Sequence, residues 1–275
     1  NERERSPGER GVTEQILNGR AAVVTGGESG IGKATALLLA QHGASVFTGD
    51  LRLRDENDAP FSDRRIQRSI CDVRDLPQLQ RLIDGAARTA GRLDFLVSNA
   101  GVVQVGQIDE ISEQQWDRVL DTNLKACFFG AKFALPHLRR TGGGCIVHTA
   151  SNAGLLPRAH DPVYSTSKLA VVGLTKSLAL SHAKDRIRVN CVCPGPVGDT
   201  DIMDDGLAES PDPIAAGQAV RDASPLAQAL GRMIAPAEVA EAILYLVSDA
   251  AVMVTGTAIA IDGGKSLGVP PRPSA

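Results

Sequence analysis

Short apolar runs alternate with longer segments of helical periodicity from residue 20 of this chain onward. The first apolar run, residues 21–25, precedes a helical pattern over residues 31–41 that ends at Gly43. The further predicted strands are residues 44–50, 68–72, 93–98, 145–150, 188–192 and 256–262. The further predicted helices are residues 76–89, 116–138, 164–183 and 236–249. Apolar strands that alternate with helices predict an α/β fold, in which one doubly wound parallel sheet carries helices on both faces.

Three segments fall outside this alternation. Residues 1–17 are charged and polar and lack the hydrophobic stretch of a secretory signal, so we expect a flexible N-terminal extension. Residues 198–235 are rich in proline, glycine, aspartate and alanine, which predicts a long loop that covers the substrate as a lid. Residues 269–275 form a predicted C-terminal tail. Because no break in composition divides the rest, residues 18–268 are expected to form a single domain.

Composition and charge narrow the class of protein. The chain has 275 residues, of which 43% are apolar and 22% charged, so it can form a packed core. Its net charge of −3 gives no basic field for nucleic acid, and no apolar run reaches the ~18 residues of a membrane span. We therefore expect neither nucleic acid nor a membrane as a partner. The five cysteines lie in apolar stretches without a CxxC pair, which indicates reduced core thiols in the cytoplasm and no metal site.

A glycine-rich loop follows the first predicted strand and opens the first predicted helix. Its sequence is Thr25-Gly26-Gly27-Glu28-Ser29-Gly30-Ile31-Gly32. Glycine lets the backbone turn sharply and approach a pyrophosphate, and the N-terminus of a helix offers free N–H groups to an anion. A strand, a loop of this kind and a helix in this order predict a dinucleotide-binding site.

The choice of nucleotide depends on the end of the second predicted strand. Asp50 is placed to accept hydrogen bonds from the adenosine ribose hydroxyls and to repel a 2′-phosphate. Arg52 and Arg54 are the counter-evidence, because a flexible arginine could reach a 2′-phosphate. NAD is therefore favoured over NADP as the cofactor.

A tyrosine and a lysine stand one helical turn apart within Tyr164-Ser165-Thr166-Ser167-Lys168, so both side chains lie on one face. A nearby ammonium favours the phenolate over the phenol, which makes Tyr164 a candidate acid/base for an alcohol and its ketone. Ser151 follows a predicted strand, where its hydroxyl could hydrogen-bond a substrate oxygen or cap a turn. Asn123 lies inside a predicted helix, a position that its propensity disfavours, so a specific hydrogen-bonding role is reasonable.

Together these features resemble the short-chain dehydrogenase/reductase family, and the resemblance covers about residues 18–265. The matching motifs, in the family's order, are TGGESGIG, Asp72-Val73, Ser98-Asn99-Ala100-Gly101, Asn123, Ser151, YSTSK, Cys193-Pro194-Gly195-Pro196-Val197 and Asp262-Gly263-Gly264. The resemblance implies a seven-stranded Rossmann-like sheet and an NAD(P)-dependent oxidoreductase.

The resemblance also implies a catalytic tetrad of Asn123, Ser151, Tyr164 and Lys168. In that scheme Tyr164 exchanges the hydroxyl proton of the substrate and Ser151 orients the substrate. Lys168 binds the nicotinamide ribose and stabilises the tyrosinate, while Asn123 positions a water that links Lys168 to solvent. The hydride transfer itself belongs to the cofactor.

A set of cofactor-binding residues is implied in the same way, with Asp72 and Val73 against the adenine and the backbone of Val197 against the carboxamide. Besides Tyr164 and Lys168, the set comprises Gly26, Ser29, Gly30, Ile31, Gly32, Asp50, Leu51, Asp72, Val73, Asn99, Ala100, Gly101, Pro194, Gly195 and Val197. The chain departs from the family where a threonine usually contacts the carboxamide. Asp199 occupies that place and Thr200 follows it, so either the loop is shifted by one residue or Asp199 has another role.

The substrate pocket is less determined. Besides Ser151 and Tyr164, its candidate residues are Asn152, Leu155, Arg158, His160, Cys193 and Met203. Arg158 or His160 could meet an anionic or hydroxylated substrate, or each could belong to a solvated loop.

The leading hypothesis is an NAD-dependent oxidoreductase for a small secondary alcohol or its ketone. A non-catalytic NAD-sensing protein and an NAD-dependent epimerase or isomerase are the alternatives. The segment 169–180 is apolar or small nearly all round the helix, which indicates burial on more than one side. A homotetramer or homodimer built on this helix, as in the family, is therefore expected.

Overall fold

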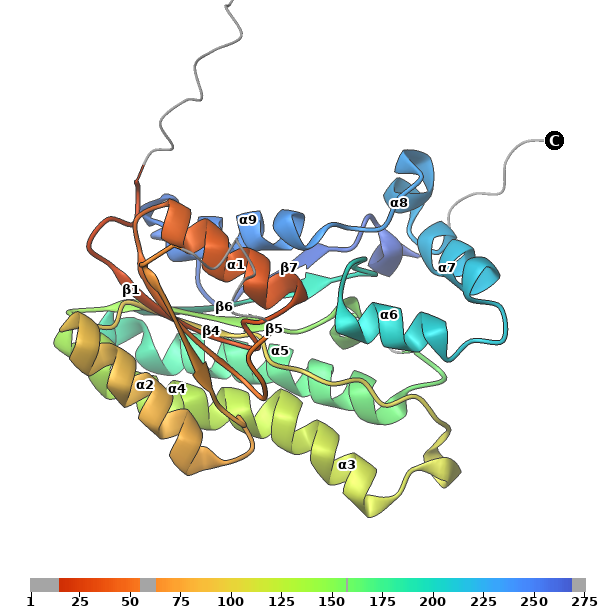
Figure 1. Ribbon diagram of the computed structural model, residues 1–275, viewed down its shortest axis with the longest axis horizontal. Helices are drawn as coiled ribbons and strands as arrows, with labels where there is room; N and C mark the ends of the chain where they lie inside the picture. The colour runs from red at the N-terminus through yellow and green to blue at the C-terminus, as the bar shows by residue number, and fades with distance from the viewer. Residues whose placement is uncertain (1–14, 55–62, 157, 269–275) are drawn as a thin grey trace, which may run out of the picture.

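A seven-stranded parallel sheet forms the centre of the computed structural model, which describes residues 15–54, 63–156 and 158–268 (Figure 1). The strand order is β3-β2-β1-β4-β5-β6-β7, and every neighbouring pair is parallel. The strands are β1 (Ala21–Thr25), β2 (Ser45–Asp50), β3 (Ile66–Ile70), β4 (Phe95–Ser98), β5 (Gly144–Thr149), β6 (Ile187–Pro194) and β7 (Ala258–Ile261). The α/β fold predicted from the sequence is confirmed.

Helices cover both faces of this sheet (Figure 1). One face carries α1 (Gly30–Gln41) and α9 (Pro236–Val247), and the other carries α2 (Leu76–Ala90), α4 (Ala126–Arg140) and α5 (Pro162–His182). The strand order changes direction between β1 and β4. In parallel sheets the ligand crevice lies at such a switch point, outside the carboxyl ends of the strands. The glycine-rich loop that follows β1 lies there.

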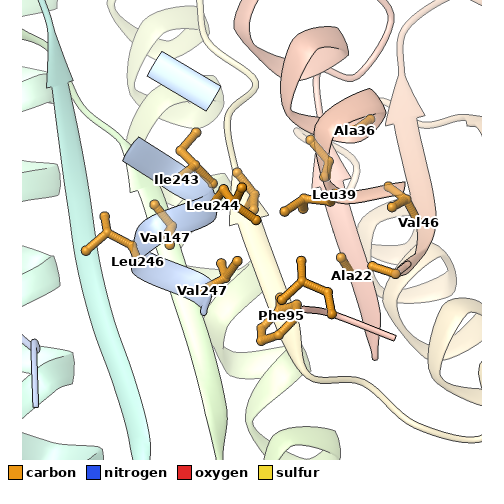
Figure 2. Close-up of a cluster of buried hydrophobic side chains, with 14 of the residues drawn as sticks. Ala22, Ala36, Leu39, Val46, Phe95, Val147, Ile243, Leu244, Leu246 and Val247 are labelled. Carbon is orange, nitrogen blue, oxygen red and sulfur yellow. The ribbon is translucent and has the colours of Figure 1, made fainter. Parts of the chain in front are cut away.

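Fully buried aliphatic side chains join α1 and α9 to the sheet (Figure 2). Leu39 of α1, Ile243 and Leu246 of α9 and Val147 of β5 belong to one cluster and are inaccessible to solvent. Each such side chain stabilises the fold by roughly 1.5–3 kcal/mol relative to an exposed one. Within the described ranges, no helix has the length and apolar character that a membrane crossing requires.

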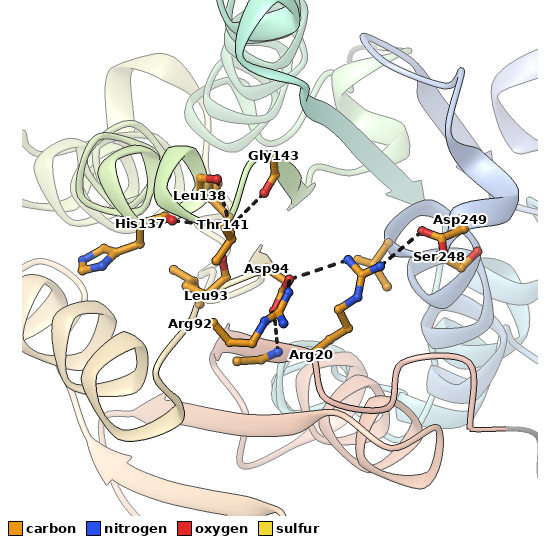
Figure 3. A network of polar contacts seen from close by, with 12 residues as sticks. Arg20, Arg92, Leu93, Asp94, His137, Leu138, Thr141, Gly143, Ser248 and Asp249 are labelled. Carbon is orange, nitrogen blue, oxygen red and sulfur yellow. Dashed lines mark hydrogen bonds and ion pairs between the residues drawn. The ribbon is translucent and has the colours of Figure 1, made fainter.

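A buried carboxylate joins the strands at the opposite edge of the sheet, where the strands begin (Figure 3). Asp94, just before β4, accepts the N–H of Ala21 at 2.8 Å and pairs with Arg92 at 2.6 Å. Arg20 lies 3.6 Å from Asp94 and 3.7 Å from Asp249, in the turn after α9. A buried carboxylate is tolerated because several donors surround it. This network connects the starts of β1 and β4 far from the glycine-rich loop.

The predicted boundaries differ from the observed ones at several elements, and two of these differences have a clear physical cause. The third strand runs over Ile66–Ile70, two residues earlier than predicted, because it is an edge strand whose register is set by pairing with β2. The polar residues at its centre give little alternation of apolar and polar positions from which a strand could be predicted. The predicted N-terminal extension also reaches too far, since Leu17 is buried and its N–H donates to the carbonyl of His42 at 2.9 Å. Residues 1–14 and the tail at 269–275 lie outside the described residues.

The segment 198–235, which was predicted to be a lid and is called the lid below, is not an irregular loop. It contains three short helices, α6 (Asp201–Ala208), α7 (Pro213–Asp222) and α8 (Pro225–Leu230). The sequence carries the start signals for these helices. The side chains of Thr200 and Asp212 accept backbone N–H groups at the starts of α6 and α7, and proline opens α7 and α8. The interpretation from composition overlooked these local signals.

Candidate active site

The glycine-rich loop after β1 lies directly against the loop after β4. A Cβ on Gly32 would stand 1.8 Å from the carbonyl oxygen of Gly26, and one on Gly26, whose φ is +65°, would stand 2.9 Å from the Cα of Ala100. The Asn99 amide donates to the carbonyls of Thr25 at 3.2 Å and Gly26 at 3.1 Å. Only glycine permits this approach, which holds the N-terminus of α1 open toward an anionic group.

Asp50, at the end of β2, lies beside this loop. Its carboxylate accepts the N–H of Glu28 at 3.1 Å and that of Leu51 at 2.7 Å. A carboxylate offers about four acceptor positions, so about two remain for ribose hydroxyls. The residues present therefore fit the adenosine ribose of a nicotinamide dinucleotide.

The glycine-rich loop itself contains a buried carboxylate, Glu28, to which the sequence pattern assigned no role. Glu28 is 2% exposed, accepts the Arg68 Nε–H at 2.8 Å and accepts the backbone N–H of Arg54 at 2.9 Å. Burial alone would raise the pKa of Glu28, but the hydrogen bonds from Arg68 and Arg54 outweigh it and lower that pKa. Arg54, after β2, and Arg68, in β3, are thus anchored to the glycine-rich loop.

The lid reaches the glycine-rich loop through α6. Asp201 forms an ion pair with Arg54 and accepts a hydrogen bond from the Ser29 hydroxyl at 3.2 Å. Arg54, which the sequence analysis weighed as a binder of a 2′-phosphate, therefore has a carboxylate partner. No local pattern indicates this contact, because 147 positions separate its two members.

The two predicted adenine contacts differ in their surroundings. Val73 is buried and packs in the cluster that includes Leu79. The Asp72 carboxylate pairs with Arg74 at 2.7 Å, and the hydrogen bonds from Arg74 lower the pKa of Asp72. Both residues follow the carboxyl end of β3, at the edge of the sheet where β2 also ends.

Tyr164 and Lys168 lie in the first turns of α5, both buried. The Lys168 Nζ lies 5.6 Å from the centroid of the Tyr164 ring and donates to the carbonyl of Thr149 at 2.9 Å. The Tyr164 hydroxyl makes no hydrogen bond within the described part of the chain and is not enclosed, so it remains open to a ligand. The spacing predicted from the sequence therefore places a free phenol beside an ammonium.

Asn123 lies in a π-helical turn, Asp121–Lys125, that joins α3 (Glu113–Leu120) to α4. One long helix was predicted here, and the wide turn is the difference. The Asn123 amide accepts the N–H of Val102 at 2.8 Å and donates to the Val102 carbonyl at 2.9 Å and the Ser167 hydroxyl at 3.0 Å. A Cβ on Gly101 would stand 3.3 Å from the Lys168 Nζ and 3.4 Å from the Asn123 Oδ1. The side chains of Asn123 and Lys168 thus meet at Gly101.

Ser151 opens a short 3₁₀ turn after β5. Its Oγ accepts the N–H of Ala153 at 3.1 Å, and its hydroxyl donates to the buried Asn152 Oδ1 at 3.3 Å. The same turn packs on α5 so closely that a Cβ on Gly154 would stand 2.6 Å from the Lys168 carbonyl oxygen. Ser151 therefore caps a turn and also lies next to the helix that carries the other reactive groups.

Two of the residues predicted to line the substrate pocket, Arg158 and His160, have different surroundings in the structure. Arg158 lies over the Tyr164 ring, with its Cζ 5.2 Å from the ring centroid, and pairs with Asp161 at 2.6 Å. Asp161 is 1% exposed and also accepts the Ser165 hydroxyl at 2.8 Å. His160 is exposed. The sequence analysis missed Asp161, although an aspartate directly before a proline and a helix is a typical N-cap signal.

Asp199 and Thr200, where the chain departs from the family pattern, lie in different surroundings. Asp199 is exposed and has a left-handed backbone, with φ +52°. Thr200 donates to the Val197 carbonyl at 3.1 Å, and a Cβ on Gly30 would stand 2.9 Å from its methyl carbon. Thr200 rather than Asp199 therefore faces the glycine-rich loop.

The segment after β6 is held from two sides. Pro194 ends β6, and a Cβ on Gly195 would stand 2.8 Å from the Cα of Asp262 after β7. Val197 is buried and forms an isolated parallel bridge with Ile234. These contacts place the predicted carboxamide loop firmly at the carboxyl edge of the sheet.

A buried histidine lies behind the site. His148 of β5 bonds the Thr175 hydroxyl through Nδ1 at 2.9 Å. Burial and the nearby charge of Lys168 lower the pKa of His148 to about 4. The cysteines are all free and buried, and no group of three or more His, Cys, Asp or Glu side chains in the described ranges could hold a metal ion.

The chain is similar to known proteins over nearly its whole length. A family model described as enoyl-(acyl carrier protein) reductase matches residues 26–266. Cis-4-hydroxycyclohexanecarboxylate dehydrogenase of Sinomonas cyclohexanicum is 39% identical over 89% of this chain and 96% of its own length. The chain belongs to the short-chain dehydrogenase/reductase family. Members of this family are oxidoreductases that use NAD(P), so the predicted resemblance is confirmed.

Other members of the family are similar over nearly their whole length. Cyclohexanol dehydrogenase of an Acinetobacter species is 35% identical over 92% of this chain and 97% of its own. The 3-oxoacyl-acyl-carrier-protein reductase FabG of Thermotoga maritima is 34% identical over 90% and 98%. The ligand-free structure of aldohexose dehydrogenase from Thermoplasma acidophilum superposes with a TM-score of 0.84 at 31% identity, covering 95% of this chain and 100% of that one.

Proposed function

We propose that this protein is an NAD-dependent dehydrogenase that interconverts a secondary alcohol, carried on a small ring, and its ketone. The observation that carries the proposal is the free hydroxyl of Tyr164 beside the Lys168 ammonium, next to the turn of Ser151 and the loop at Gly101. Two relatives are named for the oxidation of cyclohexanol and of a hydroxycyclohexanecarboxylate, which supports a ring alcohol as the substrate class.

The chemistry follows from the positions of the side chains. In alcohol oxidation Tyr164, as the phenolate that the neighbouring Lys168 ammonium favours, takes the hydroxyl proton as the carbon–hydrogen bond breaks. Ser151 hydrogen-bonds the substrate oxygen from the turn that packs on α5. Asn123 holds the Val102 backbone and α5 together through its amide, which keeps these groups in register. Bound NAD supplies the hydride acceptor.

NAD rather than NADP is proposed as the cofactor for two reasons. Asp50 keeps free acceptor positions for the ribose hydroxyls, and its charge opposes a 2′-phosphate. The arginine that could offset this charge, Arg54, is paired with Asp201 of the lid.

A homotetramer or homodimer is proposed as the assembly. In the single chain, α5 exposes Leu169 at 56% and Leu180 at 85%, and Phe128 of α4 is 49% exposed. A second subunit would cover these apolar side chains. Light scattering should give a mass of two or four chains, and a monomer at micromolar concentration would contradict this assignment.

A panel of cyclic and linear secondary alcohols with NAD, read at the NADH absorbance band, tests the proposed function. We expect NADH to form with at least one small cyclic alcohol such as cyclohexanol. Calorimetry with NAD alone runs beside the panel. If NAD binds but no alcohol or ketone reacts, the proposal of a dehydrogenase fails and the NAD-sensing alternative gains support.

A further inference from the structure

A buried ion pair beside Asp50 has no part in the proposed reaction. Glu28, in the glycine-rich loop, is 2% exposed, and the side chain of Arg68, in β3, is 13% exposed. The Arg68 Nε–H donates to Glu28 Oε1 at 2.8 Å, and the Arg68 Nη2 donates to Glu28 Oε2. Two parallel hydrogen bonds fix the guanidinium against the carboxylate. Because a buried ion pair adds little net stability, its presence here points to another role.

The backbone and the carboxylate of Glu28 connect this pair to the end of β2. The Glu28 N–H donates to Asp50 Oδ2 at 3.1 Å. The Glu28 carboxylate accepts the N–H of Arg54 at 2.9 Å, and Arg68 Nη2 donates to the Arg54 carbonyl at 2.7 Å. The pair therefore holds residue 54 by both of its backbone polar groups. Glu28 thus contacts Asp50 through its backbone and Arg68 through its side chain.

Each of the two arginines that contact this region is paired with an acidic side chain. Arg68 pairs with Glu28. Arg54 pairs with Asp201 of the lid. Among the described residues, the Asp50 carboxylate accepts backbone N–H groups only. Neither arginine therefore offsets the negative charge of Asp50, which opposes a 2′-phosphate on the adenosine ribose.

We propose that Glu28 is a specificity residue, which favours NAD over NADP by withholding the charge of Arg68 from a 2′-phosphate. Guanidinium groups bind phosphate strongly, so an Arg68 without its carboxylate would place an attractive charge one residue away from Asp50. Glu28 acts through Arg68 and does not itself contact the phosphate. The inference rests on the proposed function, which places the adenosine ribose at Asp50.

Three variants separate this charge effect from a loss of structure. The quantity compared is the ratio of affinities for adenosine 2′,5′-bisphosphate over adenosine 5′-monophosphate. Glu28→Gln leaves the Arg68 charge without its partner, so the ratio should rise by about tenfold. Arg68→Gln leaves the Glu28 charge without its partner, so the ratio should fall. The double variant removes both charges and should return the ratio to near the wild-type value.

The opposite signs of the two single changes are the decisive readout. If the contact between Glu28 and Arg68 had a structural role only, either single change would break it and both would move the ratio in the same direction. Displacement calorimetry at mildly alkaline pH, where carboxylates are ionised, measures both nucleotides. Glu241→Gln, exposed on α9, removes the same charge as Glu28→Gln and should leave the ratio unchanged.

The stability of Glu28→Gln needs a second measurement, because a guanidinium that is largely buried without its carboxylate destabilises the fold. Thermal unfolding with each nucleotide reports the same preference, since a ligand that binds only the folded state raises Tm. The extra rise in Tm with the bisphosphate should be larger in Glu28→Gln than in the wild type. Equal nucleotide preferences in the wild type and both single variants would overturn the proposal, as would a shift of both in one direction.

Neither nucleotide carries a nicotinamide, so this experiment does not depend on turnover. Opposite shifts in the two single variants support the role of Glu28 even if no alcohol is oxidised and the dehydrogenase assignment fails. Unchanged ratios in a protein that oxidises alcohols with NAD refute the role of Glu28 and leave the proposed function standing.

Discussion

Replacement of Asp50 by asparagine tests the cofactor assignment with a change of one atom. The Asp50 carboxylate has two of its about four acceptor positions filled by the N–H groups of Glu28 and Leu51. Asparagine keeps one oxygen, so at most one backbone N–H loses its partner, at a cost of about 1–3 kcal/mol in unfolding free energy. The ribose hydroxyls lose their charged acceptor, which contributes about 1.5–3 kcal/mol. At 1.4 kcal/mol per factor of ten, kcat/KM for NAD should fall by about 10- to 150-fold.

The assay measures kcat/KM for NAD and for NADP with the same alcohol, in wild type, Asp50→Asn and Asp117→Asn. Asp117 is exposed on α3, so Asp117→Asn controls for the loss of a surface charge. We expect the ratio of NADP over NAD to rise in Asp50→Asn alone. Thermal unfolding of each variant separates a binding effect from a stability effect. An unchanged kcat/KM for NAD in a folded Asp50→Asn protein would refute the role of Asp50.

Three further predictions concern the lid, the glycine-rich loop and the core. Asp201→Asn releases Arg54, so kcat/KM for NADP should rise by about tenfold, or about 1.4 kcal/mol; no gain would contradict the pairing. Gly32→Ala places a Cβ 1.8 Å from the Gly26 carbonyl oxygen and should abolish NAD binding in calorimetry. The control Gly85→Ala, in α2, meets nothing closer than 3.9 Å and should stabilise the protein by up to about 1 kcal/mol. His148 is buried in its neutral form, and its pKa in the folded protein, about 4, lies below the ordinary histidine pKa of 6.5. Because the unfolded chain takes up the proton first, the free energy of unfolding should fall by about 3 kcal/mol as pH drops from 6.5 to 4. Urea unfolding across that range should show a smaller fall in His148→Leu, and an identical pH profile would show that another group titrates.

The sheet and the reactive groups could be predicted because their signals are local. Apolar runs mark central strands, and four residues separate Tyr164 from Lys168 on any helix. The edge strand β3 was misplaced because only its first residue faces the core, so pairing with β2 rather than local pattern sets its ends. The lid helices were missed for another reason. Their caps are specific residues such as Thr200 and Asp212, which average composition hides.

Charge partners could not be predicted because folding brings them together from distant positions. The sequence allows Arg54 to reach a phosphate and allows Arg158 either to meet a substrate or to lie in a solvated loop. In the structure Arg54 pairs with Asp201, and Arg158 pairs with Asp161 and lies over Tyr164. These pairings come from the fold, whereas the motifs that indicate the reaction are local in the sequence.

The most direct measurement of the central claim is the turnover of Tyr164→Phe with NAD and the best alcohol found. General acid–base catalysis contributes about 10²- to 10⁴-fold, so kcat should fall by at least about 100-fold while NAD binding measured by calorimetry is retained. Tyr245→Phe changes the other tyrosine of the chain, which is half exposed on α9, and should turn over like the wild type. Wild-type turnover in Tyr164→Phe would contradict the account.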